Sequence, residues 1–480
     1  MRSRQLSPHR PATADVSGGG CGSIDLHSES ILIYRAMADT RILAPRFERA
    51  LVIENPHPKL DKELERQGIA VERLSDSEVK DREYVKQRLR EGQHDLLFKR
   101  SRFIVDESVL SASERLAAVV LCCIGDDSVD KQACADQGVL VLNDPVSNGR
   151  SVAEMVVGEM ILLARRIIPA HEAGRSHMWT KGSHGRHELH GKNVSVIGLG
   201  NIGRQVARLA DAFGMHVSFY DQSELAREVG LAFGWHSCST IHEAFRSADV
   251  VTLHLSAEDP EGQSNEGLLS EEHLREFGAD RPAGSPRLFV NAARGFLYDP
   301  EELKRAVRDG CIGAAAVDVF PNEPSGSDDS WHNPYADMPE VTTTPHIGAA
   351  TEDAQPRIAE HVATSAQLLN LHGTVRDTVF SPRVSIGLDS RPDYWALAVV
   401  HSDSRGTKKA ISDIIFEAGA NNIESTHRDF PRYGIAYDLS AIDAPLDDAT
   451  LETLVARASE LSGDERAIRS IRQFPVRHEE

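Results

Sequence analysis

Arg294, Glu323 and His346 form a set that could carry out acid–base chemistry on an anionic substrate. Each residue follows an apolar segment that is typical of a buried strand. Because ligands bind beyond the carboxyl ends of strands in open parallel sheets, the three side chains could share one crevice. A histidine near its neutral pKa can take an alcohol proton, and a carboxylate beside it fixes its tautomer. An arginine can hold a substrate carboxylate through two hydrogen bonds, so the set predicts oxidation of a hydroxy acid.

Each of these residues also has an ordinary structural interpretation. Arg294 could be a surface arginine, Glu323 a turn residue before Pro324, and His346 a capped loop histidine. For any one residue alone the structural interpretation is favoured, since short motifs often arise by chance. The catalytic interpretation therefore depends on the whole set and on the motifs around it.

A glycine-rich loop precedes this set. It has the spacing G-x-G-x-x-G at 198–203, directly after a strand-like segment and directly before an amphipathic helix-like one. Glycines at these positions permit a tight turn, close approach of the backbone to a pyrophosphate and close helix packing. The helix N-terminus adds free N–H groups and a partial positive charge. The residues that we expect to bind a dinucleotide here are Gly198, Gly200, Asn201, Ile202, Gly203 and Asp221.

Asp221 ends the next expected strand, near the position of an acid that binds a ribose 2′-hydroxyl. An aspartate repels the 2′-phosphate of NADP, and no arginine follows until Arg227. The sequence therefore predicts NAD as the cofactor. A glycine-rich turn in some other α/β protein is the alternative, and the strand, helix and acid around the loop argue against it.

Strand-like and helix-like segments alternate in two series, which predicts parallel sheets covered by helices. An apolar segment at 151–166 separates the series and is expected to form a helix buried between domains. The strands expected in the first series are residues 50–53, 95–98, 117–122 and 139–142. Those of the second series are residues 194–197, 217–220, 250–255, 288–291 and 314–319. We therefore expect two doubly wound, Rossmann-like α/β domains.

The last part of the chain has a different order of elements. A linker rich in Ser, Pro and Asp leads into a block with the order βαββαβ, the ferredoxin-like arrangement of many small regulatory domains. Its expected strands are residues 394–401, 423–426, 434–440 and 467–473, and its expected helices are residues 408–418 and 449–461.

The amino-acid composition limits the kinds of molecule that the protein is expected to bind. The net charge of -20 over 480 residues argues against binding of nucleic acid or of an anionic membrane, because both need a basic face. No apolar run reaches membrane-spanning length, and six cysteines without a C-x-x-C pair suit a reducing compartment. We therefore expect a soluble, cytoplasmic protein. His184, His187 and His190 lack a cysteine or carboxylate set, so we expect a solvated loop there and no metal site.

Residues 1–45 are expected to form a disordered or flexible leader. Their first part is rich in Arg, Ser, Pro and Gly, and no apolar secretory core follows the basic residues. A targeting peptide and a start at Met37 are the alternatives.

Three motifs resemble signatures of the D-isomer-specific 2-hydroxyacid dehydrogenase family. They are V-N-A-A-R-G at 290–295, G-A-A-A-V-D-V-F-P-N-E-P at 313–324 and T-P-H-I-G at 344–348. The resemblance runs from about residue 46 to the C-terminus and is strongest to bacterial-type members that oxidise phosphoglycerate and carry a C-terminal ACT domain. It implies that Arg294 binds the substrate carboxylate, that His346 is the acid–base catalyst and that Glu323 is its partner. The cofactor contacts that it adds are Ala292, Ala293, Arg294, Asp318, His346, Ile347, Gly348 and Ala349.

The resemblance also implies a discontinuous first domain. Residues 46–147 and 345–372 would form the substrate-binding domain, and the NAD-binding domain at 148–344 would be inserted between them. A linker at 373–393 would then lead to an ACT-like regulatory domain at 394–480. Similar enzymes are homo-oligomers, so we expect a dimer or a tetramer.

A phosphorylated hydroxy acid needs a second anion site. The basic run at 99–102 ends an expected strand of the first domain, which would place its cations, from Lys99 onward, at the mouth of the cleft. We expect NAD-dependent oxidation of 3-phospho-D-glycerate to 3-phosphohydroxypyruvate, the first step of serine biosynthesis. The alternatives are another small 2-hydroxy or 2-keto acid (2-hydroxyglutarate, glycerate or lactate) and a non-catalytic NAD sensor. By resemblance, Lys181 approaches from the neighbouring subunit. The expected substrate-binding residues are Arg100, Ser101, Arg102, Ile124, Gly125, Asn148 and Lys181.

The ACT-like domain has three candidate effector residues, His401, Asp403 and Asn422. Asn421 and Asn422 give a candidate partner across the fold for the residues at the strand end that includes His401. In similar enzymes this domain binds serine, which makes serine a candidate effector. Asp403 stands where an asparagine is usual. A carboxylate there removes a hydrogen-bond donor and repels a ligand carboxylate, which argues against inhibition by serine.

Overall fold

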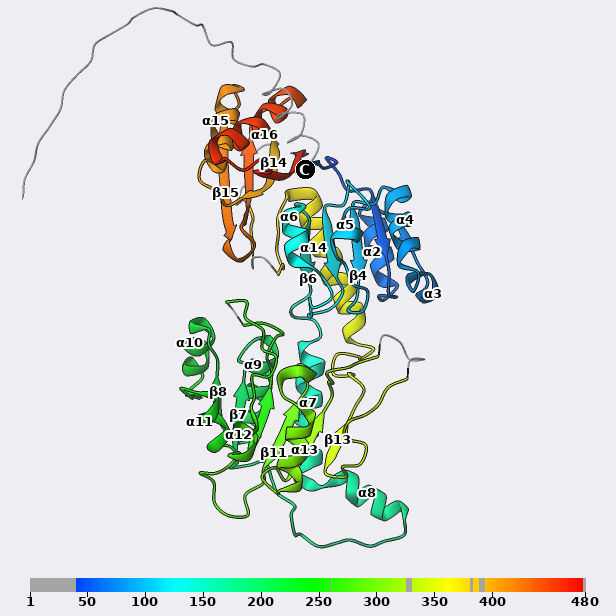
Figure 1. Ribbon diagram of the computed structural model, residues 1–480, viewed down its shortest axis with the longest axis vertical. Helices are drawn as coiled ribbons and strands as arrows, with labels where there is room; N and C mark the ends of the chain where they lie inside the picture. Colours follow the sequence, from blue (N-terminus) through cyan, green and yellow to red (C-terminus); the bar gives the residue numbers. More distant parts are fainter. Residues whose placement is uncertain (1–39, 260, 325–329, 380–382, 388–392, 478–480) are drawn as a thin grey trace, which may run out of the picture.

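The computed structural model describes residues 40–259, 261–324, 330–379, 383–387 and 393–477. They form three β-sheets with helices packed on them (Figure 1). No helix within these ranges has the length and apolarity needed to cross a membrane. The cysteines within them are free thiols, and Cys21 lies outside the described residues.

The first sheet has five parallel strands in the order β3-β2-β4-β5-β6. Alternate residues of its strands face two different cores, because helices cover both faces. Val52 packs with α2 and α14 on one face, whereas Leu51 packs with α4 on the other. The strands are β2 (Arg49–Val52), β3 (Ala70–Arg73), β4 (Leu96–Lys99), β5 (Ala118–Leu121) and β6 (Leu140–Asn143). The helices are α2 (Lys59–Arg66), α3 (Asp76–Val79), α4 (Arg82–Gly92), α5 (Glu107–Leu110), α6 (Lys131–Asp136) and α14 (Ala354–His372).

The second sheet has seven parallel strands in the order β13-β12-β11-β10-β7-β8-β9. Helices α7 and α9 pack on one face, and α11, α12 and α13 pack on the other. The strands are β7 (Asn193–Ile197), β8 (His216–Tyr220), β9 (His236–Ser237), β10 (Val250–Leu253), β11 (Leu288–Asn291), β12 (Ala314–Val317) and β13 (Val341–Thr343). The helices are α7 (Gly149–Arg165), α8 (Ile167–Arg175), α9 (Asn201–Ala212), α10 (Glu224–Ala232), α11 (Ile241–Arg246), α12 (Glu271–Arg275) and α13 (Pro300–Arg308), with the short 3₁₀ helix η1 (Gly295–Leu297).

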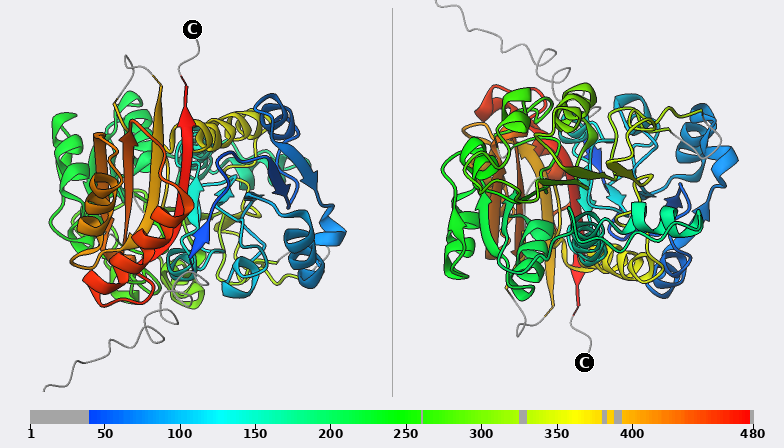
Figure 2. Two further views of the ribbon diagram at one scale, coloured as in Figure 1. Left: turned by 90° about the horizontal axis from the view of Figure 1, so that it is seen from above. Right: turned by 90° about the horizontal axis from the view of Figure 1, so that it is seen from below.

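The third sheet has the order β1-β17-β14-β16-β15, which contains the ferredoxin-like arrangement of the block βαββαβ. Helices α15 and α16 cover one face. The other face shares a core with α14 and the first sheet, and Figure 2 shows the yellow helix α14 beside the red strand β17. The elements are β1 (Arg41–Ile42), β14 (Tyr394–Ser402), α15 (Thr407–Glu417), β15 (Asn422–Phe430), η2 (Pro431–Tyr433), β16 (Ile435–Ile442), α16 (Asp448–Ser462) and β17 (Ile468–Val476).

A buried arginine fastens the third sheet to the first. The guanidinium of Arg472 lies 4.0 Å from the ring centre of Phe47 and 4.1 Å from that of Phe474. It also donates hydrogen bonds to the carbonyl oxygens of Leu369 and Asn370, near the C-terminus of α14. Arginine suits this place because its planar, weakly hydrated group stacks on rings and still supplies several donors.

These observations confirm the predicted fold class of two doubly wound α/β units and a ferredoxin-like unit. Two details differ from the expectations. Helix α7 packs on α9 and the second sheet rather than between domains. The leader was expected to extend to residue 45, whereas Arg41–Ile42 forms strand β1, which pairs in parallel with β17. Residues 1–39 of the expected leader lie outside the described residues.

Candidate functional site

The glycine-rich loop joins β7 to α9 in a conformation that requires glycine at two of its positions, Gly198 and Gly203. Gly198 has a φ of 92°, and a Cβ there would lie 2.5 Å from the carbonyl oxygen of His254. A Cβ on Gly203 would lie 2.0 Å from the carbonyl oxygen of Gly198. At Gly200 a Cβ would meet nothing within 4 Å, so the N-terminus of α9 is open to a ligand at this point. The loop thus fits a bound pyrophosphate.

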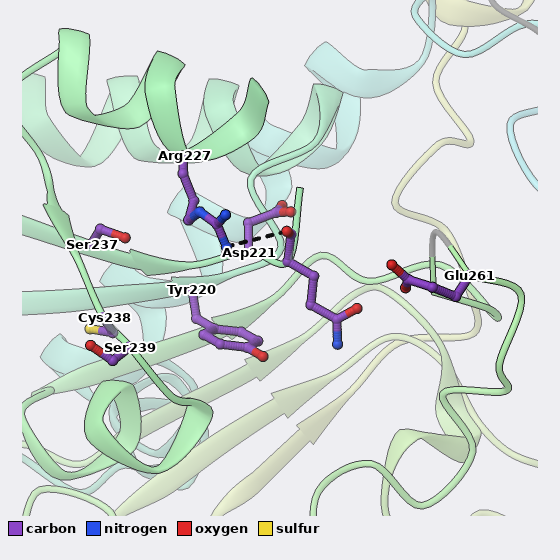
Figure 3. A pocket seen from close by; sticks show the side chains of 8 residues that line it. Tyr220, Asp221, Arg227, Ser237, Cys238, Ser239 and Glu261 are labelled. Carbon is purple, nitrogen blue, oxygen red and sulfur yellow. Dashed lines mark hydrogen bonds between the residues drawn. The ribbon is translucent and has the colours of Figure 1, made fainter. Parts of the chain in front are cut away.

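Asp221 follows β8 and lies beside this loop. Its Oδ2 accepts a hydrogen bond from the backbone N–H of Leu199 at 2.6 Å, and its Oδ1 accepts one from Ser223 at 2.8 Å. A pocket of about 510 Å³ opens there, which is large enough for part of a dinucleotide (Figure 3). Its lining residues are Tyr220, Asp221, Gln222, Arg227, Ser237, Cys238, Ser239 and Glu261. The fold thus brings Arg227 into the same pocket as Asp221, although six positions separate them in sequence.

His346 and Glu323 form a short hydrogen bond. The distance from His346 Nδ1 to Glu323 Oε2 is 2.6 Å, and Glu323 also accepts from the backbone N–H of Phe320. The hydrogen bond to Glu323 raises the pKa of His346, although partial burial opposes this. Burial by itself would raise the pKa of Glu323, but the hydrogen bond and charge of His346 outweigh it and lower that pKa. The pair therefore stabilises a protonated imidazole beside an ionised carboxylate.

Asp318 holds the backbone that carries His346. Its two carboxylate oxygens accept hydrogen bonds from the Thr344 hydroxyl at 2.6 Å and from the N–H groups of Ile347 and Gly348 at 2.9 Å. His346 itself has a φ of 51°, in the left-handed region that non-glycine residues seldom adopt. The expected contact of Asp318 with the cofactor would thus come from a side chain already engaged with its own chain.

Arg294 lies between the two parallel sheets. It follows β11, and its Nε donates to Asp127 Oδ2 at 3.1 Å, in the loop after β5. A Cβ on Gly125 would lie 3.0 Å from Arg294 Nη2. The positive charge of Arg294 helps to lower the pKa of Glu323, and it weakly opposes the rise in the pKa of His346 that Glu323 causes. The structure therefore brings the three predicted catalytic residues together, and it adds Asp127, which the sequence analysis missed.

The basic run at 99–102 divides into buried and accessible parts. Lys99 is fully buried, and its ammonium donates to Ser128 Oγ and to the carbonyl oxygen of Arg100. Glu54, also buried, accepts from the backbone N–H groups of Arg100 and Arg102 and so shapes the turn. The prediction that the whole run faces the cleft was therefore wrong for Lys99, whereas Arg100 is partly exposed and Ser101 and Arg102 are exposed.

The other expected substrate residues lie in three different places. Ile124 and Gly125 lie in the loop that reaches Arg294. Asn148 is buried at the N-terminus of α7, and its Oδ1 has no hydrogen-bond partner within the described ranges. Lys181 is exposed in the segment after α8 and contacts none of the other candidates in the described part of the chain.

Of the expected effector residues, His401 and Asn422 lie at opposite ends of the third sheet. His401 is opposite Ala436 in the strand register, whereas Asn422 is opposite Ile442. His401 is buried, and Asp403 is exposed in the loop after β14. One chain therefore does not bring Asn422 to His401, and the expected pairing across the fold is absent from the described residues.

Glu159 is a buried acid that the sequence analysis left without a role. It lies on α7, is 4% exposed, and neither of its carboxylate oxygens has a hydrogen-bond partner in the described part of the chain. Burial, helped by the negative charge of Asp318, raises its pKa to about 8. Its position among the apolar residues Val156, Val157, Met160 and Leu163 was the signal in the sequence.

Comparisons with known proteins agree with this site. Residues 157–348 match the NAD-binding domain of D-isomer specific 2-hydroxyacid dehydrogenases. The chain is 33% identical over 371 residues to a D-3-phosphoglycerate dehydrogenase of Escherichia coli, which covers 77% of this chain and 86% of that protein. It is also 34% identical over 340 residues to D-3-phosphoglycerate dehydrogenase 2 of Saccharomyces cerevisiae, which covers 69% of each chain.

Solved structures agree in fold. A protein of Thermus thermophilus superposes with a TM-score of 0.56 at 26% identity, covering 69% of this chain and 99% of that one. A D-lactate dehydrogenase of Aquifex aeolicus, complexed with NAD and lactic acid, superposes with a TM-score of 0.55 at 23% identity. The match with the latter covers 67% of this chain and 95% of the other.

Proposed function

The chain belongs to the D-isomer-specific 2-hydroxyacid dehydrogenases, and from that premise we propose that it oxidises 3-phospho-D-glycerate to 3-phosphohydroxypyruvate. It is an NAD-dependent oxidoreductase. The observation that carries the proposal is the close pair of His346 and Glu323 beside Arg294. The reaction would be the first step of serine biosynthesis.

His346 acts as the base in this proposal. Its Nδ1 is held by Glu323, which leaves Nε2 to meet the substrate hydroxyl. Nε2 takes the hydroxyl proton while carbon 2 gives up a hydride, and Glu323 stabilises the imidazolium that results. NAD⁺, when bound, supplies the acceptor for that hydride. Arg294 holds the substrate carboxylate and so fixes which hydrogen of carbon 2 faces the cofactor.

Asp127 competes with the substrate for Arg294. Its carboxylate already accepts a hydrogen bond from Arg294 Nε. A hydroxy-acid carboxylate must therefore replace this contact or share the guanidinium, which has five N–H donors. We expect the contact to keep the arginine oriented in the free enzyme.

The phosphate would bind at Arg100 and Arg102. The backbone contacts of Glu54 fix the turn that carries both cations. Lys181 follows α8, which lies at the end of the molecule away from β4 and the first sheet (Figure 1), and this supports the expectation that it completes the site of a neighbouring subunit in a homo-oligomer. In this assignment, residues 46–147 and 345–372 form the substrate-binding domain and residues 148–344 form the NAD-binding domain.

Steady-state turnover with NAD⁺ and a set of acids tests the substrate. Phosphoglycerate should give a kcat/KM at least tenfold above those for glycerate, lactate and 2-hydroxyglutarate, about the value of one charged hydrogen bond. Equal values for phosphoglycerate and glycerate would overturn the assignment of the phosphate site. His346→Ala should abolish NADH formation, and an unchanged rate would overturn the assigned base.

A further inference from the structure

Two histidines and an aspartate meet on the third sheet, on the face covered by α15 and α16. His401 lies near the end of β14, His427 in β15 and Asp438 in β16, three neighbouring strands (Figure 1). One ligand atom from each residue lies within 4.8 Å of the other two. His427 is directly opposite Asp438 in the strand register, and its Nδ1 lies 3.3 Å from Asp438 Oδ2.

His401 has an unused nitrogen that points to a missing ligand. The side chain belongs to a residue that is 1% exposed, and its Nδ1 lies 2.8 Å from the carbonyl oxygen of Ser402. That contact requires Nδ1 to carry the proton, so Nε2 has a free lone pair. Nε2 has no hydrogen-bond partner among the described residues. Buried polar atoms seldom lack a partner, and metal-bound histidines commonly donate their other N–H to a carbonyl oxygen in this way.

We propose that His401, His427 and Asp438 bind a divalent transition-metal ion, with Zn²⁺ as the preferred ion. Two imidazoles and a carboxylate favour Zn²⁺, Co²⁺ or Ni²⁺ over Mg²⁺ and Ca²⁺, which prefer oxygen ligands alone. This site is separate from the histidine cluster at 184–190, for which no metal is expected.

The surroundings of the site resemble those of other metal-bound histidines. Asp429 Oδ1 lies 2.6 Å from His427 Nε2, so His427 can turn Nδ1 toward the ion while Asp429 holds its other nitrogen. The stacked rings of His401 and His427 have centres 5.4 Å apart. Three protein ligands leave a fourth position for water or for the nearby carboxylate of Asp403, which lies close to His427.

Lys408 would compete with the metal ion for the carboxylate of Asp438. At the start of α15, its ammonium lies 3.1 Å from the same Asp438 Oδ2 that would ligate the metal. Its side chain is 48% exposed, so it can swing into solvent when an ion enters. Removal of this ammonium should therefore strengthen metal binding, which a purely structural role of the cluster would not predict.

Metal retention by the full-length protein tests the proposal. After incubation with one equivalent of Zn²⁺ and gel filtration, the wild type should retain about one ion per chain by elemental analysis. His427→Ala and Asp438→Asn should lose it, and His242→Ala should keep it. His242 is a matched control because it lies in another cluster with Glu272 and Glu276. Retention of Zn²⁺ by His427→Ala equal to that of the wild type, or none by the wild type, would overturn the site.

A second pair of variants tests the metal site without changing any of its proposed ligands, so that misfolding of a ligand variant cannot explain the result. Lys408→Met should lower the Kd for Zn²⁺ about tenfold, as expected when one competing ion pair near the metal is removed. Lys409→Met removes a neighbouring lysine that pairs with Asp413 instead, and it should leave the Kd unchanged. Equal Kd values for both variants would contradict the role of Asp438. Co²⁺ should give visible absorption bands of a four-coordinate site, and their absence would count against the ligand set.

Discussion

At the scale of single residues, Asp127 and Arg294 make one contact that links two separately folded sheets. The pair is partly exposed, and such pairs contribute about 0.2–1 kcal/mol. Asp127→Asn should therefore lower the KM for the hydroxy acid by about two- to fivefold, because the substrate no longer competes with a carboxylate. Asp126→Asn is the control, since Asp126 pairs with Lys131. A higher KM in Asp127→Asn would show that orientation of Arg294 outweighs competition.

A second residue-scale prediction concerns the pH dependence of oxidation. Oxidation requires neutral His346, and Glu323 raises the pKa of this histidine, so kcat/KM should rise with pH through that raised pKa. Glu323→Gln should move this limb to lower pH and reduce kcat on the order of a hundredfold. Steady-state profiles of kcat/KM against pH would measure both effects. Glu301→Gln, an exposed change on α13, should leave the limb in place. If kcat/KM rises over the same pH range in Glu323→Gln as in the wild type, Glu323 does not set the pKa of the catalytic base.

The structure brings together those predicted residues whose motifs include their partners. His346, Glu323 and Arg294 each lie in a short signature, and the strand ends that carry them meet at one edge of the sheet. Asp127 and Glu159 were missed because their significance depends on distant partners or on burial, which no local pattern reveals. Lys99 was misplaced since a strand covered on both faces buries its last residue as well.

At the scale of elements, helix α7 places the carboxyl group of Glu159 in a buried environment that disfavours its ionised form. Burial raises the pKa of Glu159 from 4.5 to about 8, so the folded state binds this proton more tightly than the unfolded state. The stability that the bound proton on Glu159 gives the folded state is therefore lost as the pH rises from about 4.5 to about 8. Glu159→Gln should raise the free energy of unfolding by about 1–3 kcal/mol at the upper end of that range and change it little at the lower end.

Chemical denaturation at both ends of this pH range would measure the difference. Glu154→Gln is the matched control, because Glu154 lies on the same helix but is exposed and paired with Arg150. A similar gain in both variants would assign the effect to helix propensity rather than to burial.

Elements with apolar patterns could be predicted, and those with polar patterns could not. The central strands of both parallel sheets lie within a few residues of their expected positions. Strand β3, with the sequence A-V-E-R, was missed because it lies at a sheet edge and has no continuous apolar run. Strand β15 is longer than expected for the same reason, since its polar residues extend along the free edge of the third sheet.

At the scale of the whole molecule, Arg472 couples the third sheet to the first unit. Arg472→Lys would lose the ring stacking and about two hydrogen bonds, so it should lower the free energy of unfolding by about 2–3 kcal/mol. The melting temperature should fall by several degrees, and proteolysis between residues 373 and 393 should become faster. Arg457→Lys, a partly exposed change on α16, should have little effect. Equal stability of both variants would show that the apolar core alone holds the two units together.

The pairing of β1 with β17 has a consequence for how the chain folds during synthesis. Arg41–Ile42 leaves the ribosome long before its partner strand β17, which begins at Ile468. The core on one face of the first sheet is likewise covered only after α14 has been synthesised. Among the sheets that the described residues form, only the seven-stranded one has all its strands and helices in one uninterrupted stretch, so it can fold while translation continues. The units on either side are completed only once α14 and β17 have been synthesised.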